Sequence, residues 1–314
     1  MHERFVGRSG LAVSRLGLGT ASWGRDTDEH EAADLFRLFL EAGGTLLDTA
    51  ASYGAGASEA LIGRLLADVR RDDVVLVSKA GTSGPSGRAG TSRSAMLSTL
   101  DTSLARLGTD HLDLWLVQGW DPRVPVDETL SALDHAVATG RTRYAGIANY
   151  TGWQTAYAHT RQALLPSAAP IVATEVEYSL LARQVEREVV PAAETLGVGL
   201  LAWSSLGRGV LTGKYRYGIP SDSRAASDHL AGFVEPYLDA PSRQVVEAVC
   251  RAAEGLQLTP LEVALAWVRD RPGVASALIG PRTAAQLKAA LSVEQVTLPV
   301  EITEALEDVS IETV

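Results

Sequence analysis

Short apolar segments alternate along the chain with amphipathic segments whose apolar residues recur every three or four positions. Continuous apolar segments are typical of strands buried on both faces, whereas the longer period is typical of helices with one face against a core. The apolar segments predict strands at 16–19, 45–48, 74–79, 112–118, 144–149, 171–176, 198–203 and 277–280. The amphipathic segments predict helices at 29–41, 58–69, 93–107, 127–139, 152–165, 185–196, 260–269 and 283–291.

This alternation predicts an α/β protein with eight strand–helix units, which is the count of a (β/α)8 TIM barrel. The competing architecture is a doubly wound sheet, which normally has fewer strands and a glycine fingerprint at its first turn. We expect two additions, namely an N-terminal hairpin over 5–14 that could close the barrel bottom and an extra C-terminal helix within 299–314. The expected organisation is a single barrel domain over residues 1–314.

Two loops are candidates for forming a binding pocket. The segment 204–241 is too long for an ordinary strand-to-helix loop and is rich in Gly, Ser and Pro, and a second candidate loop spans 81–90. Long loops on a rigid scaffold are commonly functional or disordered.

Composition narrows the classes of function. The chain has 314 residues, with 28 Lys and Arg against 38 Asp and Glu, so its net charge of −10 argues against nucleic acid or an anionic membrane as the main partner. The single cysteine, Cys250, excludes an internal disulfide framework and fits a reducing compartment. Neither a secretory signal nor an apolar stretch of about 18 residues is visible, and we expect a cytoplasmic protein.

Familiar phosphate and metal motifs are not matched. Gly17 and Gly19 begin a dinucleotide pattern, but the next glycine is Gly24, which is too far along the chain. The run ending at Lys214 lacks the glycine and the hydroxyl residue that a P-loop needs at 208 and 215. The six histidines contain no pair four residues apart, so no metal site is predicted.

Polar residues that can carry chemistry gather at the ends of three successive predicted strands. Asp48 ends the second strand and Tyr53 lies in the loop after it, Lys79 ends the third, and Gln118 ends the fourth. The carboxyl ends of barrel strands meet at one face, so we expect Asp48, Tyr53 and Lys79 to lie close together.

This grouping suggests proton delivery to a carbonyl oxygen. A lysine beside a phenol is expected to lower the pKa of Tyr53 toward working pH, and Asp48 would keep Lys79 charged and oriented. Tyr53 could then donate its proton as a hydride reaches the carbonyl carbon. The simpler alternative is a structural Asp48–Lys79 ion pair beside an ordinary loop aromatic, but the three residues together favour function.

Four segments resemble the aldo-keto reductase family, and the likeness extends over nearly the whole chain. They are RLGLGT at 15–20, DTAASYGAGASE at 48–59, Ser78-Lys79, and GRGVLTGK at 207–214, of which 48–59 is the most specific. The run KYRYGIPSDSR at 214–224 resembles the branch that contains the potassium-channel β subunits and their bacterial reductase relatives.

The resemblance implies a barrel that binds NADPH or NADP+ in extended form at its top. It implies that Tyr53 is the general acid, tuned by Asp48 and Lys79. Asn149 would hold the nicotinamide carboxamide and Trp203 would stack on its ring. The other implied cofactor contacts are Gly19, Thr20, Asp48 and Glu175, then Ser204, Ser205, Leu206, Gly207 and Gly209 at the pyrophosphate, and Lys214, Arg224, Gly280, Arg282 and Gln286 at the adenosine half.

The chain departs from the family pattern at several positions. Gln118 stands where the family has histidine, and a glutamine can hydrogen-bond a carbonyl but cannot titrate. Ala148 replaces a serine, and alanines at 289–290 replace an acidic residue and an asparagine. Glu175 replaces a glutamine, and it could accept a hydrogen bond from the nicotinamide amide, while its charge could favour the oxidised, cationic ring.

These observations lead to two hypotheses of function. The first is an NADPH-dependent oxidoreductase that reduces an aldehyde, ketone or keto-sugar, with a small-molecule carbonyl compound as its partner. The second is an NADP(H)-binding sensor or regulatory subunit with little turnover, as the channel-subunit likeness and Gln118 suggest. Trp23, Trp120 and Tyr178 are candidate pocket walls that are more often plain packing. The sequence leaves the oligomeric state open, and a homo-oligomer is one of the alternatives.

Overall fold

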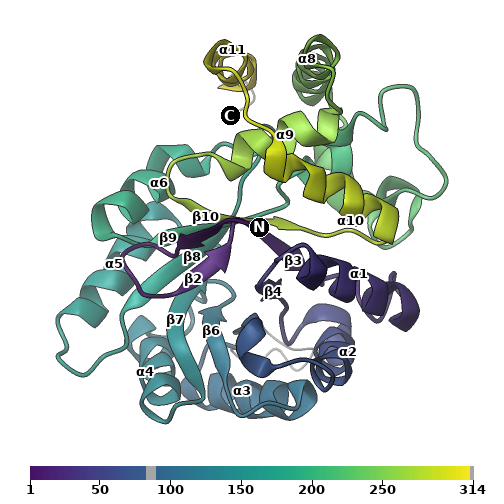
Figure 1. Ribbon diagram of the computed structural model, residues 1–314. Coiled ribbons are helices and arrows are strands. Elements are labelled where there is room, and N and C mark those ends of the chain that lie inside the picture. Colours follow the sequence, from purple (N-terminus) through teal and green to yellow (C-terminus); the bar gives the residue numbers. More distant parts are fainter. Residues whose placement is uncertain (83–89, 312–314) are drawn as a thin grey trace.

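A closed barrel of eight parallel strands forms the centre of the protein (Figure 1). This computed structural model describes residues 1–82 and 90–311, so most of the candidate loop 81–90 lies outside the described residues. The predicted (β/α)8 barrel is confirmed, and the doubly wound alternative is excluded because the sheet closes between β10 and β3. The strands are β3 (Leu16–Gly19), β4 (Leu46–Asp48), β5 (Val75–Ala80), β6 (Leu112–Val117), β7 (Thr142–Ala148), β8 (Ile171–Glu177), β9 (Gly199–Trp203) and β10 (Val274–Ile279).

A ring of helices surrounds the strands, as Figure 1 shows, and buries the outer apolar layer of the core. Capping fixes several boundaries: Asp28 accepts a hydrogen bond from the N–H of Glu31, and Thr259 forms a capping box with Glu262. Helices α1, α3, α6 and α9 begin and end at the predicted residues. The ring contains α1 (Glu29–Glu41), α2 (Ala57–Leu66), α3 (Arg93–Leu107), α4 (Val126–Ala138), α5 (Gly152–Ala163), α6 (Val185–Leu196), α9 (Pro260–Arg269) and α10 (Ala284–Leu291).

The segment after β9 is more ordered than the sequence suggests. Within the predicted loop 204–241 lie the 3-10 turns η3 (Gly207–Thr212), η4 (Arg224–Ala226) and η5 (Glu235–Tyr237) and the short helix α7 (Ala231–Val234). A further helix, α8 (Ala240–Leu256), follows at once, and the sequence analysis did not predict it.

The start of α8 explains why it was missed. Asp239 caps the helix by accepting a hydrogen bond from the N–H of Ser242 at 2.9 Å, and Pro241 lies in the first turn, where a missing N–H costs little. Pro241 therefore begins a helix instead of ending a loop. The expected C-terminal helix is present as α11 (Val300–Ile311), and it packs against α8 (Figure 1). Across 1–82 and 90–311, no helix combines the length and apolar character needed to cross a bilayer.

The N-terminal hairpin closes the bottom of the barrel. Its strands β1 (Glu3–Phe5) and β2 (Ala12–Ser14) pair antiparallel, which confirms the predicted hairpin. Between and beside them, Val6, Leu11 and Val13 are buried in the cluster that fills the barrel interior. The chain passes so close to β9 that a Cβ on Gly7 would lie 2.3 Å from the carbonyl oxygen of Gly197, and Gly7 has a left-handed φ of +56°.

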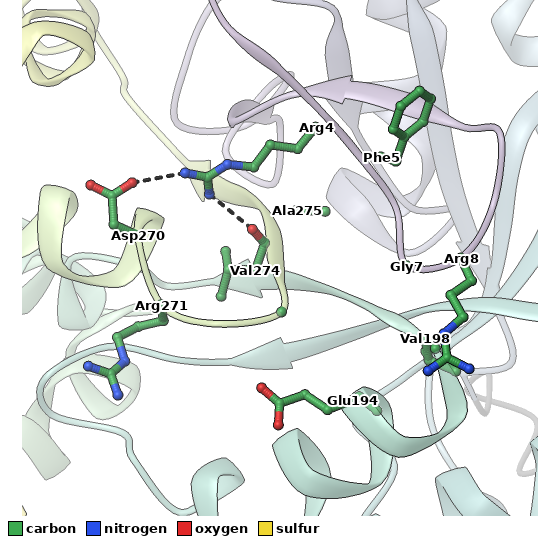
Figure 2. A pocket seen from close by; sticks show the side chains of 13 residues that line it. Arg4, Phe5, Gly7, Arg8, Glu194, Val198, Asp270, Arg271, Val274 and Ala275 are labelled. Carbon is green, nitrogen blue, oxygen red and sulfur yellow. Dashed lines mark hydrogen bonds and ion pairs between the residues drawn. The ribbon is translucent and has the colours of Figure 1, made fainter.

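A pocket of about 440 Å³ lies at this lower end of the barrel (Figure 2). Arg4 crosses it, donating to Asp270 at 2.9 Å and to the carbonyl of Val274 at 3.0 Å. Glu194 and Arg8 face the same space from α6 and the hairpin. Active sites of such barrels lie at the opposite, carboxyl ends of the strands, so the contacts of Arg4 serve to fasten the hairpin to the barrel.

The close approach at Gly7 predicts a large loss of stability for Gly7→Ala. The added methyl group would collide with backbone atoms, and we expect the free energy of unfolding to fall by about 3 kcal/mol. Gly108→Ala is the control, since Gly108 shares the left-handed conformation but has no atom within 4 Å of the new Cβ, and it should lose only about 1 kcal/mol. Equal losses in urea denaturation would contradict this account.

Candidate active site

A buried lysine with two carboxylate partners forms the floor of the candidate site. Lys79 on β5 is 2% exposed, and Asp48 on β4 and Glu175 on β8 are each 3% exposed. The Lys79 ammonium donates to Oδ1 of Asp48 and to Oε2 of Glu175, the latter at 2.9 Å. The structure thus brings Asp48 and Lys79 together, and it adds Glu175, which the sequence analysis had placed at the nicotinamide amide.

Tyr53 lies beside this cluster at the start of η1 (Tyr53–Gly56). The centre of its ring is 5.3 Å from the Lys79 ammonium nitrogen. The N–H of Ala51 donates to the carbonyl of Lys79 at 3.1 Å, which holds the loop against β5. Gly54 and Ala55 adopt left-handed φ angles of 56° and 54°, which turn the chain from Tyr53 into α2.

The acidity of Tyr53 differs from the sequence expectation. Burial raises the pKa of its phenol, Lys79 lowers it, and Asp48 and Glu175 raise it further, so the net pKa lies above the ordinary value. The expected lowering is therefore wrong, because the phenol is buried and the lysine charge is opposed by two carboxylates instead of one. Tyr53 is protonated at neutral pH, which suits a proton donor.

The charges of Lys79, Asp48 and Glu175 also affect the pKa values within this cluster. Burial lowers the pKa of Lys79, but the attraction of Asp48 and Glu175 outweighs burial and the net pKa is raised. For Glu175, burial and the repulsion of Asp48 exceed the attraction of Lys79 and raise its pKa to about 8. At pH 7, below that value, the Glu175 carboxyl therefore holds its proton in most molecules. Over the described residues, no group of three or more His, Cys, Asp or Glu side chains could hold a metal ion.

Hydrogen bonds join the side chains at the rim above this floor. The side-chain amide of Asn149 donates to the carbonyl of Gln118 at 2.9 Å and its oxygen accepts from the Trp203 indole N–H at 3.0 Å. The Gln118 amide contacts the Ser52 hydroxyl at 3.2 Å. Three predicted site residues from the ends of β6, β7 and β9 therefore form one connected row.

The loop that follows β9 has an unusual backbone. Ser204, Gly207, Arg208 and Gly209 all have left-handed φ angles, and a Cβ on Gly207 would lie 2.8 Å from a methyl carbon of Leu181. Ser205 is buried and donates to the carbonyl of Ala202 at 2.9 Å, while Leu206 is half-buried.

Backbone strain is concentrated at this end of the barrel. Of the five non-glycine residues with left-handed φ in the described chain, Ala55, Asn149, Ser204 and Arg208 lie in loops after β4, β7 and β9. Such residues cost about 1 to 3 kcal/mol each and tend to cluster at functional sites.

Arg208 fastens this strained loop to the barrel. Its guanidinium forms a bidentate ion pair with Glu177, the last residue of β8, at 2.8 and 2.7 Å. Tyr237 from the distant end of the same loop donates to Glu177 at 3.0 Å, and the guanidinium lies 4.0 Å from the centre of the Phe233 ring. This group was not predicted from the sequence, because nothing in the spacing of Glu177 and Phe233 signals their contact.

Three cationic side chains gather beyond that loop. Burial and the nearby charges of Arg224 and Arg282 lower the pKa of Lys214, although Tyr215 opposes them. Arg224 donates to the carbonyl of Gly280 at 2.9 Å, Arg282 donates to the carbonyl of Asp222, and the N–H of Arg282 donates to Gln286 at 2.8 Å. None of these three cations forms an ion pair with a carboxylate of the described chain, and the group therefore suits a phosphate.

Other expected contacts lie deeper than predicted. Thr20 is fully buried, and its hydroxyl donates to the carbonyl of Asp48 at 2.9 Å and contacts the Ser58 hydroxyl at 2.8 Å, so it supports Asp48 from within. Gly19 pairs with Asp48 across the two strands. Trp23 and Tyr178 are fully buried, which agrees with packing and removes both as pocket walls.

The third candidate wall, Trp120, packs between the buried Tyr150 and the exposed Trp153. Trp120 makes edge-to-face contacts with Tyr150 and with Trp153, each with 5.3 Å between ring centres. Trp153 is largely exposed at the start of α5, and the sequence analysis did not select it.

The raised pKa of Glu175 predicts a pH-dependent cost to stability. Between the ordinary value of 4.5 and about 8, the folded protein binds a proton that the unfolded chain releases, so Glu175 reduces stability as pH rises through that range. Relative to Glu175→Gln, the wild type should lose about 2 kcal/mol or more of unfolding free energy between pH 5 and 8. Glu254→Gln, at an exposed position on α8, should show no such trend. A constant difference between wild type and Glu175→Gln would show that Glu175 is ionised throughout.

Comparisons with known proteins agree on one family. The sequence matches the Aldo/keto reductase family over residues 15–311. It is 35% identical to "Uncharacterized oxidoreductase YrpG" of Bacillus subtilis (strain 168), covering 98% of this chain and 96% of that protein.

Two further relatives have different names. A "Probable voltage-gated potassium channel subunit beta" of Oryza sativa subsp. japonica is 34% identical, over 89% of this chain and 87% of the relative. The "L-glyceraldehyde 3-phosphate reductase" of Escherichia coli (strain K12) is 32% identical, over 92% of this chain and 86% of the relative.

Proposed function

The chain belongs to the aldo/keto reductase family of oxidoreductases, and on that premise we propose that it uses NADPH to reduce an aldehyde, ketone or keto-sugar to an alcohol. The observation that carries the proposal is the protonated phenol of Tyr53 beside the buried Lys79 ammonium. A protein that only bound the nucleotide would need neither the Tyr53 phenol nor the Lys79 ammonium beside it. The whole of residues 1–314 would act as one barrel domain.

The residues present fit NADPH. The three cations Lys214, Arg224 and Arg282 supply positive charge that no carboxylate of the described chain neutralises by an ion pair, and they would hold the 2′-phosphate of the adenosine half. The strained loop would lie along the pyrophosphate, and Asn149 and Trp203 would hold the nicotinamide ring. The remaining contacts would be made by Gly19, Thr20, Asp48, Glu175, Ser204, Ser205, Leu206, Gly207, Gly209, Gly280 and Gln286.

Bound NADPH supplies a hydride to the carbonyl carbon, and the protein supplies the proton. Tyr53 would donate that proton to the oxygen as negative charge develops on it. Lys79 would stabilise the phenolate that remains, while Asp48 keeps the ammonium in place. Gln118 would orient the carbonyl oxygen through its amide, and because an amide does not titrate, it would add no proton relay.

The second candidate is a regulatory subunit with little turnover. The relatives named as potassium-channel subunits support it, as does Gln118 in place of the family histidine. The two candidates differ in one measurable property, since a regulatory subunit would bind NADPH tightly without oxidising it in the presence of aldehydes.

Loss of the phenol should remove catalysis and spare binding. Tyr53→Phe is expected to lower kcat for aldehyde-dependent NADPH oxidation by about 10² to 10⁴, while the Kd for NADPH stays unchanged. Tyr157→Phe is the matched control, because Tyr157 is exposed on α5, and it should keep full activity. Turnover that survives in Tyr53→Phe would reject Tyr53 as the acid. Tight binding by the wild type without turnover on a panel of aldehydes would favour the regulatory role.

The cationic group should select for the 2′-phosphate. Lys214→Met is expected to raise the Kd for NADPH by about tenfold and to leave the Kd for NADH unchanged, since only NADPH carries the extra phosphate. Lys288→Met, at an exposed position on α10, is the control for a lost positive charge. Quenching of tryptophan fluorescence measures both constants. Equal effects on the two cofactors would remove the assigned role of Lys214.

A further inference from the structure

We propose that Glu175 holds a proton beside Lys79 and Asp48 and releases it when the oxidised cofactor binds, so that Glu175 sets the preference of the site for NADP+ over NADPH. This inference rests on the function proposed above, because it concerns how the same site distinguishes the two redox forms.

The floor of the site contains two carboxyl groups but only one ammonium group to balance their charge. A single ammonium faces two carboxylates, and the residues Lys79, Asp48 and Glu175 are each no more than 3% exposed. With both carboxylates ionised, the buried cluster would carry an uncompensated negative charge, which is costly away from water. Two carboxyl groups that share a site avoid this cost by holding one proton between them. The raised pKa of Glu175, about 8, is consistent with that arrangement.

Within residues 1–82 and 90–311, the other elements around Glu175 provide no second cation. On the neighbouring strands β7 and β9, the residues paired with Glu175 are Ala148 and Leu201, which are uncharged. Tyr53 approaches from η1 and is neutral at physiological pH, so Lys79 and Asp48 are the charged groups that the structure places against Glu175. The proton is therefore the available counter-charge until a cationic ligand arrives.

Glu175 also lies close to the residues that would hold the nicotinamide ring, so its charge can interact with the charge of the ring. Strand β8 runs between β7, which leads directly into Asn149, and β9, which ends at Trp203. The N–H of Asn149 donates to the Glu175 carbonyl at 2.9 Å, so the expected ring-binding residue is joined to the same stretch of backbone. The oxidised ring carries one positive charge and the reduced ring carries none. An ionised Glu175 suits the first and a protonated Glu175 suits the second.

The inference has a defined pH dependence. Binding of NADP+ expels a proton from the cluster, so its affinity should rise with pH until the free protein has already lost that proton, near pH 8. Binding of NADPH should not change the protonation of the cluster. The ratio of the Kd for NADP+ to the Kd for NADPH should therefore fall between pH 6 and 8 and level off above. Both forms carry the same 2′-phosphate, so its titration cancels in the ratio.

The test measures binding and proton release instead of turnover. Isothermal titration at pH 7, in two buffers of different ionisation enthalpy, gives the protons released by each cofactor form. The wild type should release about one proton more with NADP+ than with NADPH. Glu175→Gln should show no difference between the two forms, and its Kd ratio should be independent of pH and about tenfold higher than that of the wild type at pH 8.5. Glu254→Gln, which removes an exposed charge from α8, should behave as wild type.

The outcomes separate this inference from the proposed function. If the wild type binds both forms with equal proton release, or if Glu175→Gln leaves the ratio and its pH dependence unchanged, the inference is wrong and the reductase proposal stands. If neither form binds the wild type, both proposals are wrong. A thermal melt checks that the variant folds, and if it does not, the proton release of the wild type alone decides.

Discussion

The ammonium of Lys79, held between carboxylates in the interior of the barrel, is the interaction on which the rest of the site depends. Asp48 comes from the neighbouring strand, but Glu175 comes from β8, which is three strands away from β5 around the barrel. The second ion pair therefore crosses the lumen and joins opposite walls. Removing one partner from such a buried pair leaves an uncompensated charge, so the three residues form one unit.

The surrounding loops are arranged around that unit at some cost in backbone energy. Tyr53 is turned toward Lys79 by left-handed residues that follow it, and Asn149 and Ser204 adopt the same conformation where their strands end. Packing of the barrel and the pairing of Arg208 with Glu177 hold these conformations in place. The stability of the fold thus maintains a rim that would not persist in an isolated loop.

The periodicity of the sequence was sufficient to predict the barrel, since each strand and helix buries its apolar residues locally. Contacts across the lumen were not predictable in the same way. Strand ends show that Asp48 and Lys79 share a face, but not that Glu175 reaches Lys79 from the far wall. The pKa of Tyr53 was expected in the wrong direction because its sequence position shows neither the burial of the phenol, which is the largest cause, nor the second carboxylate. Helix α8 was missed for a local reason, because Pro241 was taken as part of a loop.

The hairpin at the barrel bottom has a consequence for the movement of protons. Val6, Leu11 and Val13 fill the lumen below the charged floor, so no file of water can run along the barrel axis from that end. A proton that the floor exchanges with bulk solvent would leave at the upper end of the barrel, where Gln118, Asn149 and Trp203 form the rim. Because the lower end is closed by apolar side chains, whatever covers that rim also controls how quickly the interior exchanges protons with solvent.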